Sequence, residues 1–256
     1  MTIPQLAGTQ LLAFILVLGR VAPLFLLAPV FSASLLAARS KFVAAAAISL
    51  ALAPIATRHH SIPTDPLAFA LAFAHEACIG LAFAFALGVL AAAVQAGASL
   101  VDTLSGFSLG ASLDPITGTQ NAVLGQVYSI FAVMIFVISG GVQLMIMGVA
   151  RSYSLVPLGS TPSPGQFAAL ALHGLESVPV IGLEIVAPVV LALVVTDVAL
   201  GLLARSVPQM NAFMLGLPAK VILAFAVVAA SLPFLATHLQ DDLVQALNAA
   251  LGGLHS

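Results

Sequence analysis

Six long runs of apolar residues, separated by short polar segments, dominate the pattern of this chain. The runs cover residues 6–31, 42–56, 67–94, 122–150, 178–204 and 213–237. A helix needs about 20 apolar residues to cross the roughly 30 Å hydrocarbon core of a bilayer. Lipid offers no hydrogen-bond partner to the backbone, so long apolar runs that span it are typically helices. The pattern therefore predicts an all-α membrane protein with about six hydrophobic helices.

Three parts of this pattern are irregular. The first run contains Arg20, Pro23 and Pro29, so we expect its second half to kink or unwind. The second run is short for a membrane span, and we interpret it as half of a kinked hairpin with the first. Residues 238–254 place a leucine at every fourth position from Leu239 to Leu251. This spacing predicts a C-terminal amphipathic helix that lies on a membrane or on a partner subunit.

Residues 97–125, which read GASLVDTLSGFSLGASLDPITGTQNAVLG, separate the third and fourth runs. Glycine recurs five times in this stretch, and the pair Asp114-Pro115 favours a turn. We therefore expect the backbone to bend repeatedly here. Apolar side chains alternate with the glycines, which is unusual for a solvated loop. The stretch is therefore predicted to be a re-entrant loop that packs inside protein.

Composition supports the membrane assignment and excludes several functions. Apolar residues make up 61% of the chain and charged residues only 6%. Seven Lys and Arg residues against nine Asp and Glu leave no basic surface for nucleic acid. The single cysteine, Cys78, lies in an apolar run, where we expect a small core residue.

Five Asp, Glu, Lys and Arg residues fall within the apolar runs, where each charge costs about 2.5 to 3.5 kcal/mol on insertion scales. We predict that they are buried and pair between helices, and a proton or ion path is the alternative. They are Arg20, Glu76, Glu184, Asp197 and Lys220. The distribution of Lys and Arg between the polar segments favours a cytoplasmic turn between the fifth and sixth helices.

Sequence motifs of enzymes are lacking. The chain has no phosphate-binding loop with lysine, no G-x-S-x-G and no H-E-x-x-H. His59 and His60 are adjacent rather than four apart, which does not suit a helical metal pair. We therefore expect no catalytic residue, no cofactor and no metal site.

Three motifs resemble the FliR family, a membrane subunit of the bacterial flagellar type III export gate. They are GFSLGASLDPITGTQNAVLG at residues 106–125, SLVPLG at 154–159 and TDVALGLLARSVPQMNAFMLGLPAK at 196–220. The chain departs from the family at residues 139–141, Ser-Gly-Gly, where relatives commonly have a polar turn. The last two helices also resemble the FliQ subunit, a helical hairpin with a Pro, Gln and Asn turn.

The resemblance implies one FliR-like domain over residues 1–256. Its parts would be a FliP-like part at 1–177, a FliQ-like hairpin at 178–237 and an amphipathic tail at 238–256. It also implies a non-enzymatic subunit, in the cytoplasmic membrane and the flagellar basal body, that joins FliP-like and FliQ-like subunits. FlhB-like and FlhA-like components and unfolded flagellar export substrates are further implied partners.

In the family, a loop that corresponds to residues 97–125 plugs the export channel. Carried over to this chain, the pore plug comprises Gly106, Phe107, Ser108, Leu109, Gly110, Ala111, Ser112, Leu113, Asp114 and Pro115. The cytoplasmic hairpin turn comprises Arg205, Pro208, Gln209 and Asn211. The alternative for the loop is a connector buried between helices.

Two alternatives for the function stay open. One is a secondary transporter for protons or ions that uses Glu76, Glu184 and Asp197. The other is the equivalent subunit of a virulence injectisome.

Overall fold

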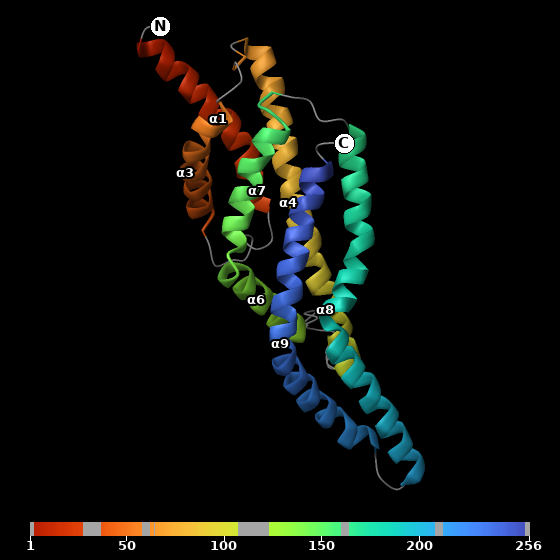
Figure 1. The fold of residues 1–256 in the computed structure, drawn as a ribbon. Coiled ribbons are helices and arrows are strands. Elements are labelled where there is room, and N and C mark those ends of the chain that lie inside the picture. The colour runs from red at the N-terminus through yellow and green to blue at the C-terminus, as the bar shows by residue number, and fades with distance from the viewer. Residues whose placement is uncertain are drawn as a thin grey trace, which may run out of the picture. The chain divides into compact units, whose positions relative to one another are not determined.

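All secondary structure in the described residues is α-helical. The computed structural model describes residues 3–27, 37–57, 62–63, 65–106, 123–159, 164–207 and 212–253. Within them the helices are α1 (Ile3–Leu27), α3 (Ala38–Ala56), α4 (Pro66–Ser105), α6 (Val123–Ile138), α7 (Gly141–Leu155), α8 (Pro164–Ser206) and α9 (Ala212–Gly253) (Figure 1). Five are long and apolar enough to cross a membrane, or six if α6 and α7 form one bent span. The predicted all-α membrane fold is confirmed.

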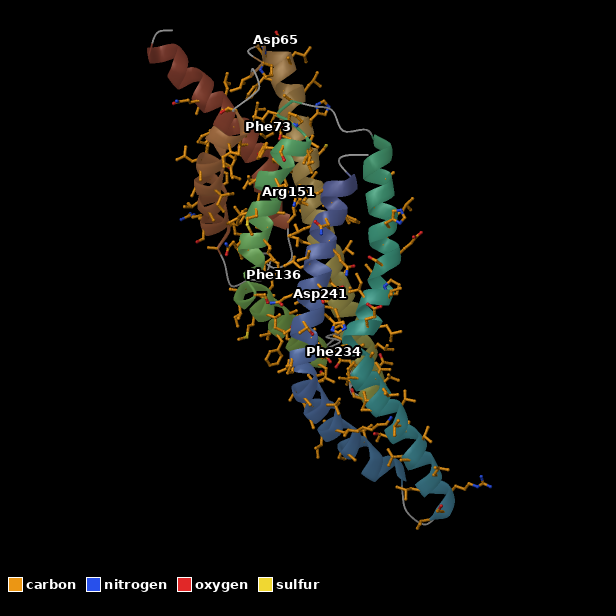
Figure 2. The ribbon with its side chains drawn as sticks, viewed as in Figure 1. Asp65, Phe73, Phe136, Arg151, Phe234 and Asp241 are labelled. Carbon is orange, nitrogen blue, oxygen red and sulfur yellow. The ribbon has the colours of Figure 1, made fainter. Side chains whose placement is uncertain are left out.

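The helix predicted at residues 67–94 is longer than expected and runs to Ser105 as α4. At its start lies Asp65, which is labelled in Figure 2. Its carboxylate accepts a hydrogen bond from the Ala68 amide at 3.0 Å. Near its end, the Thr103 hydroxyl donates to the Ser99 carbonyl within the helix at 2.8 Å. The helix stops at Gly106, whose φ of 89° suits glycine. The predicted repeated bending is therefore wrong for residues 97–105.

The single helix predicted at residues 122–150 is also wrong. The structure has two helices, α6 and α7, which meet at an angle of 63°. Between them, Gly140 has a φ of 74°, a left-handed conformation that ends one helix before the next begins. The Ser139-Gly140-Gly141 sequence permits this break because Gly140 carries no Cβ that would oppose it.

The last two helices are longer than the apolar runs that predicted them. α8 begins at Pro164, a favourable first residue, and continues through Pro179 and Pro188. α9 includes the expected amphipathic tail without a break. The leucine stripe of this tail is buried within the chain rather than left for a membrane or partner surface, at Leu239, Leu243, Leu247 and Leu251.

Three smaller expectations can also be compared with the structure. α1 stays helical through Pro23 as far as Leu27, and Pro29 lies outside the described residues. α3 begins at Ala38, so the polar residues before the second apolar run form its first turn. Cys78 on α4 is exposed rather than a core residue.

The chain divides into two compact units. Unit 1 comprises Met1–Leu90, Ser139–Glu176 and Leu243–Ser256, and unit 2 comprises Ala91–Ile138 and Ser177–Asp242. In unit 1, α3 packs along α1 and also contacts α7 (Figure 1). The buried face of α3 carries small or apolar residues at helical spacing, namely Ala45, Ser49, Leu52 and Ala56. The sequence-based division at residues 177 and 237 stays a prediction.

In unit 2, α4 and α8 approach each other closely at two glycines. A Cβ on Gly97 would overlap the Gly182 carbonyl oxygen, and a Cβ on Gly182 would lie 2.6 Å from the Ala93 carbonyl oxygen. Only glycine permits this backbone contact. The close approach places the last turns of α4 against α8.

Candidate functional site

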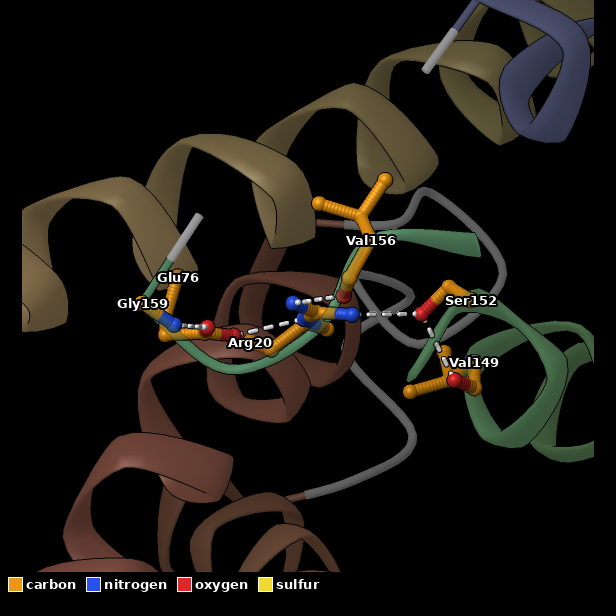
Figure 3. A network of polar contacts seen from close by, with 6 residues as sticks. All are labelled: Arg20, Glu76, Val149, Ser152, Val156 and Gly159. Atoms are coloured by element: carbon orange, nitrogen blue, oxygen red, sulfur yellow. Dashed lines mark hydrogen bonds and ion pairs between the residues drawn. The ribbon is translucent and has the colours of Figure 1, made fainter. Parts of the chain in front are cut away.

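Unit 1 contains a fully buried ion pair. The Arg20 Nε on α1 donates to the Glu76 Oε2 on α4 at 2.6 Å, and neither side chain is exposed (Figure 3). The same guanidinium donates from Nη1 to the Ser152 hydroxyl at 2.9 Å and from Nη2 to the Val156 carbonyl at 3.1 Å. Each of its three nitrogens therefore has an acceptor, which offsets the cost of burying the charge.

The partners of this pair are themselves held in place. Glu76 uses its second oxygen, Oε1, to accept the Gly159 amide at 3.2 Å. The Ser152 hydroxyl donates to the Val149 carbonyl at 2.7 Å (Figure 3). The Arg20 Cζ lies 4.1 Å from the centre of the Tyr153 ring, a cation–π contact. The network thus joins α1, α4, α7 and the turn after α7.

Unit 2 contains a second buried carboxylate, Asp102, near the end of α4. Its Oδ1 accepts the Leu124 amide and its Oδ2 accepts the Gly125 amide, both at 2.9 Å. These amides belong to the first turn of α6, whose N–H groups have no partner within their own helix. Asp102 therefore caps α6 from another helix, although 22 residues separate it from Leu124.

A third polar group brings together α4, α8 and α9. The Lys220 ammonium on α9 forms an ion pair with Asp197 on α8 and donates to the Leu104 carbonyl on α4 at 3.3 Å. Its side chain is 16% exposed, against 44% for that of Asp197. A cation at the C-terminal end of α4 also interacts favourably with the dipole of that helix.

The structure places the five predicted buried charges differently. Arg20 pairs with Glu76, and both are buried as predicted. Asp197 pairs with Lys220 but is exposed, and Glu184 also lies exposed on α8, so the predicted burial is wrong for these two carboxylates. Of the expected plug residues, only Gly106 is within the described part of the chain, and residues 107–115 lie outside it. Of the hairpin turn, Arg205 is exposed in the last turn of α8, and Pro208, Gln209 and Asn211 lie outside the described residues.

Sequence reasoning missed several members of these groups. Asp102 belongs to the stretch 97–125, but the pattern alone could not show that it caps α6. Ser152, Val156 and Gly159 lie in or next to the SLVPLG motif, which carried the resemblance without revealing its contacts. An aspartate in the last turn of a long apolar helix was the one usable signal, because such a charge needs a partner.

The polar groups described above form structural contacts between helices. Among the residues that the structure describes, no three His, Cys, Asp or Glu side chains gather closely enough to hold a metal ion. His59 and His60 lie outside the described residues. The buried carboxylates Glu76 and Asp102 accept hydrogen bonds from fixed donors on both oxygens.

Comparison with known proteins finds similarity to bacterial export proteins. The family model for bacterial export proteins, family 1, matches residues 11–246. The flagellar biosynthetic protein FliR of Bacillus subtilis is 30% identical over 216 residues, which are 83% of each chain. FliR of Escherichia coli K12 is 28% identical over 223 residues, which cover 85% of this chain and 83% of that one. The surface presentation of antigens protein SpaR of Shigella sonnei is 32% identical over 154 residues, which cover 60% of this chain and 59% of SpaR.

Proposed function

Because this chain belongs to the bacterial export proteins, family 1, we propose that it forms part of the wall and plug of a flagellar protein export channel. In broader terms, the protein is a multi-pass membrane subunit of a type III export apparatus. The observation that carries the proposal is the similarity to a flagellar biosynthetic protein over 83% of both chains. The channel itself is non-enzymatic, and other components supply the energy for export.

The buried polar groups support a role in a channel wall. Arg20, Glu76 and Asp102 are each satisfied by protein partners, so α1, α4, α6 and α7 are held by contacts that need neither lipid nor water. A wall around a passing polypeptide needs such rigidity. The exposed apolar side chains on α8, among them Leu191, Val195 and Leu202, remain available to lipid or to other subunits.

The plug in this proposal comprises residues 106–115, with the sequence GFSLGASLDP. Glycines allow the backbone to fold back, and the apolar side chains exclude water from the pore. The subunit works with FliP-like and FliQ-like subunits, and with FlhB-like and FlhA-like components, in the cytoplasmic membrane of the basal body. The passing substrates are unfolded flagellar proteins.

The transporter alternative has less support. It uses Glu76, Glu184 and Asp197 as a path through the membrane, but Glu76 and Asp197 form ion pairs with Arg20 and Lys220, and Glu184 is exposed. If it holds, the purified chain alone catalyses proton-coupled uptake into liposomes, and Asp197→Asn abolishes that uptake. Absence of uptake by the lone chain removes this alternative.

The decisive experiment replaces residues 107–115 by a few glycines in the assembled complex. We expect normal subunit composition and a several-fold rise in ion leakage across the membrane. Unchanged permeability of an intact complex counts against the plug. Deletion of the whole gene in the source bacterium then separates the two export systems, because loss of flagellar secretion supports the flagellar role and loss of effector secretion alone supports the injectisome.

A further inference from the structure

The end of α4 and the start of α6 are joined by one side chain. Asp102 is 5% exposed, and its two oxygens accept the amides of Leu124 and Gly125. These amides belong to the second and third residues of α6, the positions that an N-cap side chain normally serves. Within a membrane or a protein interior, water cannot replace such an acceptor.

The sequence explains why the cap comes from another helix. The residue that precedes α6 is Ala122, whose side chain has no acceptor. In contrast, α4 is capped locally, because Asp65 lies just before its first residue and accepts the Ala68 amide. A local cap stabilises one helix, whereas a cap supplied by Asp102 also ties α6 to α4.

The end of α4 is itself held in place. Lys220 on α9 donates to the Leu104 carbonyl at 3.3 Å and pairs with Asp197 on α8. The Gly97 and Gly182 contact lies less than two turns before Asp102 on α4. Asp102 therefore lies on a helix end that has two further contacts in unit 2.

We propose that Asp102 is a positioning residue that holds the first turn of α6 against the last turn of α4, so that the end of α4 and the start of α6 lie at adjacent points. This inference rests on the proposed function, because those points bound the segment that contains the proposed plug residues. The role differs from helix capping alone, since it requires that the acceptor belong to α4.

The test measures the separation of the two helix ends directly. Spin labels at the exposed positions of Thr103→Cys and Gln126→Cys report this distance in the assembled export complex, after Cys78→Ser removes the native thiol. We expect one narrow distance peak in the parent protein and its loss in Asp102→Ala. Asp102→Asn retains one acceptor oxygen, so an intermediate width is expected.

A second substitution separates positioning from capping. Ala122→Asp supplies a local acceptor to α6, as Asp65 does for α4. In Asp102→Ala with Ala122→Asp, we expect the thermal stability of the complex to recover while the distance peak remains lost and ion leakage stays raised several-fold. Recovery of the narrow peak in this double variant overturns the proposal, as does an unchanged peak in Asp102→Ala. If Asp102→Ala does not assemble, the same comparison is made with Asp102→Asn.

Asp65→Ala is the matched control, because it removes a carboxylate that caps only its own helix. It is expected to leave both the distance peak and the leakage unchanged. Failure of the plug hypothesis is distinguishable: the peak is then lost in Asp102→Ala, while neither this variant nor the one shortened at residues 107–115 leaks. A leaking shortened variant together with an unchanged peak in Asp102→Ala overturns the positioning role alone.

Discussion

Arg20 on α1 and Glu76 on α4 form a fully buried ion pair at 2.6 Å, although 56 positions separate them in the sequence. Either charge alone would be costly in this environment, because burial removes its hydration. The pair is tolerated because Ser152, Val156 and Gly159 satisfy its remaining donors and acceptor. It makes α1, α4 and the end of α7 depend on one another.

Glu76→Gln is expected to destabilise the protein by about 3 to 5 kcal/mol, because Arg20 then remains buried without a counter-charge. Thermal unfolding in detergent measures the loss. The control is Arg20→Met combined with Glu76→Leu, which removes both charges and is expected to cost less than either single substitution. A Glu76→Gln protein that unfolds at the parent temperature contradicts the assigned pairing.

Gly97→Ala and Gly182→Ala are each expected to cost about 1 to 3 kcal/mol, because the new methyl group forces α4 and α8 apart. Gly88→Ala on α4 and Gly201→Ala on α8 are matched controls, since a Cβ there meets nothing within 4 Å. The controls are expected to be neutral or slightly stabilising, because alanine favours helix more than glycine does. Equal midpoints of unfolding in all four variants rule out the close approach.

Gly140→Ala is expected to cost about 1 to 2 kcal/mol, because the residue has a φ of 74° and alanine is strained there. Space is not the cause, since the nearest atom to a new Cβ is 4.0 Å away. Gly140→Asn is expected to cost less, because asparagine tolerates the left-handed region. Comparison of the two unfolding temperatures checks this, and an alanine variant as stable as the parent argues against the break between α6 and α7.

Lys220→Met is expected to destabilise unit 2 more than Asp197→Asn does. Loss of Lys220 leaves the Leu104 carbonyl without its donor, at about 1 to 3 kcal/mol, and also leaves Asp197 without its partner. Asp197 is 44% exposed, so its neutralisation costs at most about 1 kcal/mol. Unfolding of the two variants side by side measures the order, and a larger loss in Asp197→Asn reverses the assignment.

Much of the helical framework could be predicted because membrane helices follow from local composition. Runs of apolar residues located most of the helical segments, although one predicted helix is the two helices α6 and α7. Four of the five charges within the runs do form ion pairs, and Glu184 is exposed instead. The ends of the helices could be predicted less well. Residues 95–105 continue α4, although they are more polar than the run before them. The Ser99 and Thr103 hydroxyls there donate to carbonyls of the same helix, so these polar groups have partners within it.

The contacts between distant residues could not be predicted. Five ionisable residues needed partners, yet nothing in their spacing paired Arg20 with Glu76, or Lys220 with Asp197, or left Glu184 exposed. No role was predicted for Asp102, because the two amides that donate to it lie on a helix that begins 21 residues later.

The sequence by itself determined that this is a helical membrane protein and, through its motifs, the family to which it belongs. Apolar length and motif order are local properties, which the chain carries whether or not it is folded. Only the tertiary structure decided which charges pair, where α6 separates from α7 and which helix caps α6. These depend on the free energy of contacts between residues far apart in the chain, which exist only after the helices have packed.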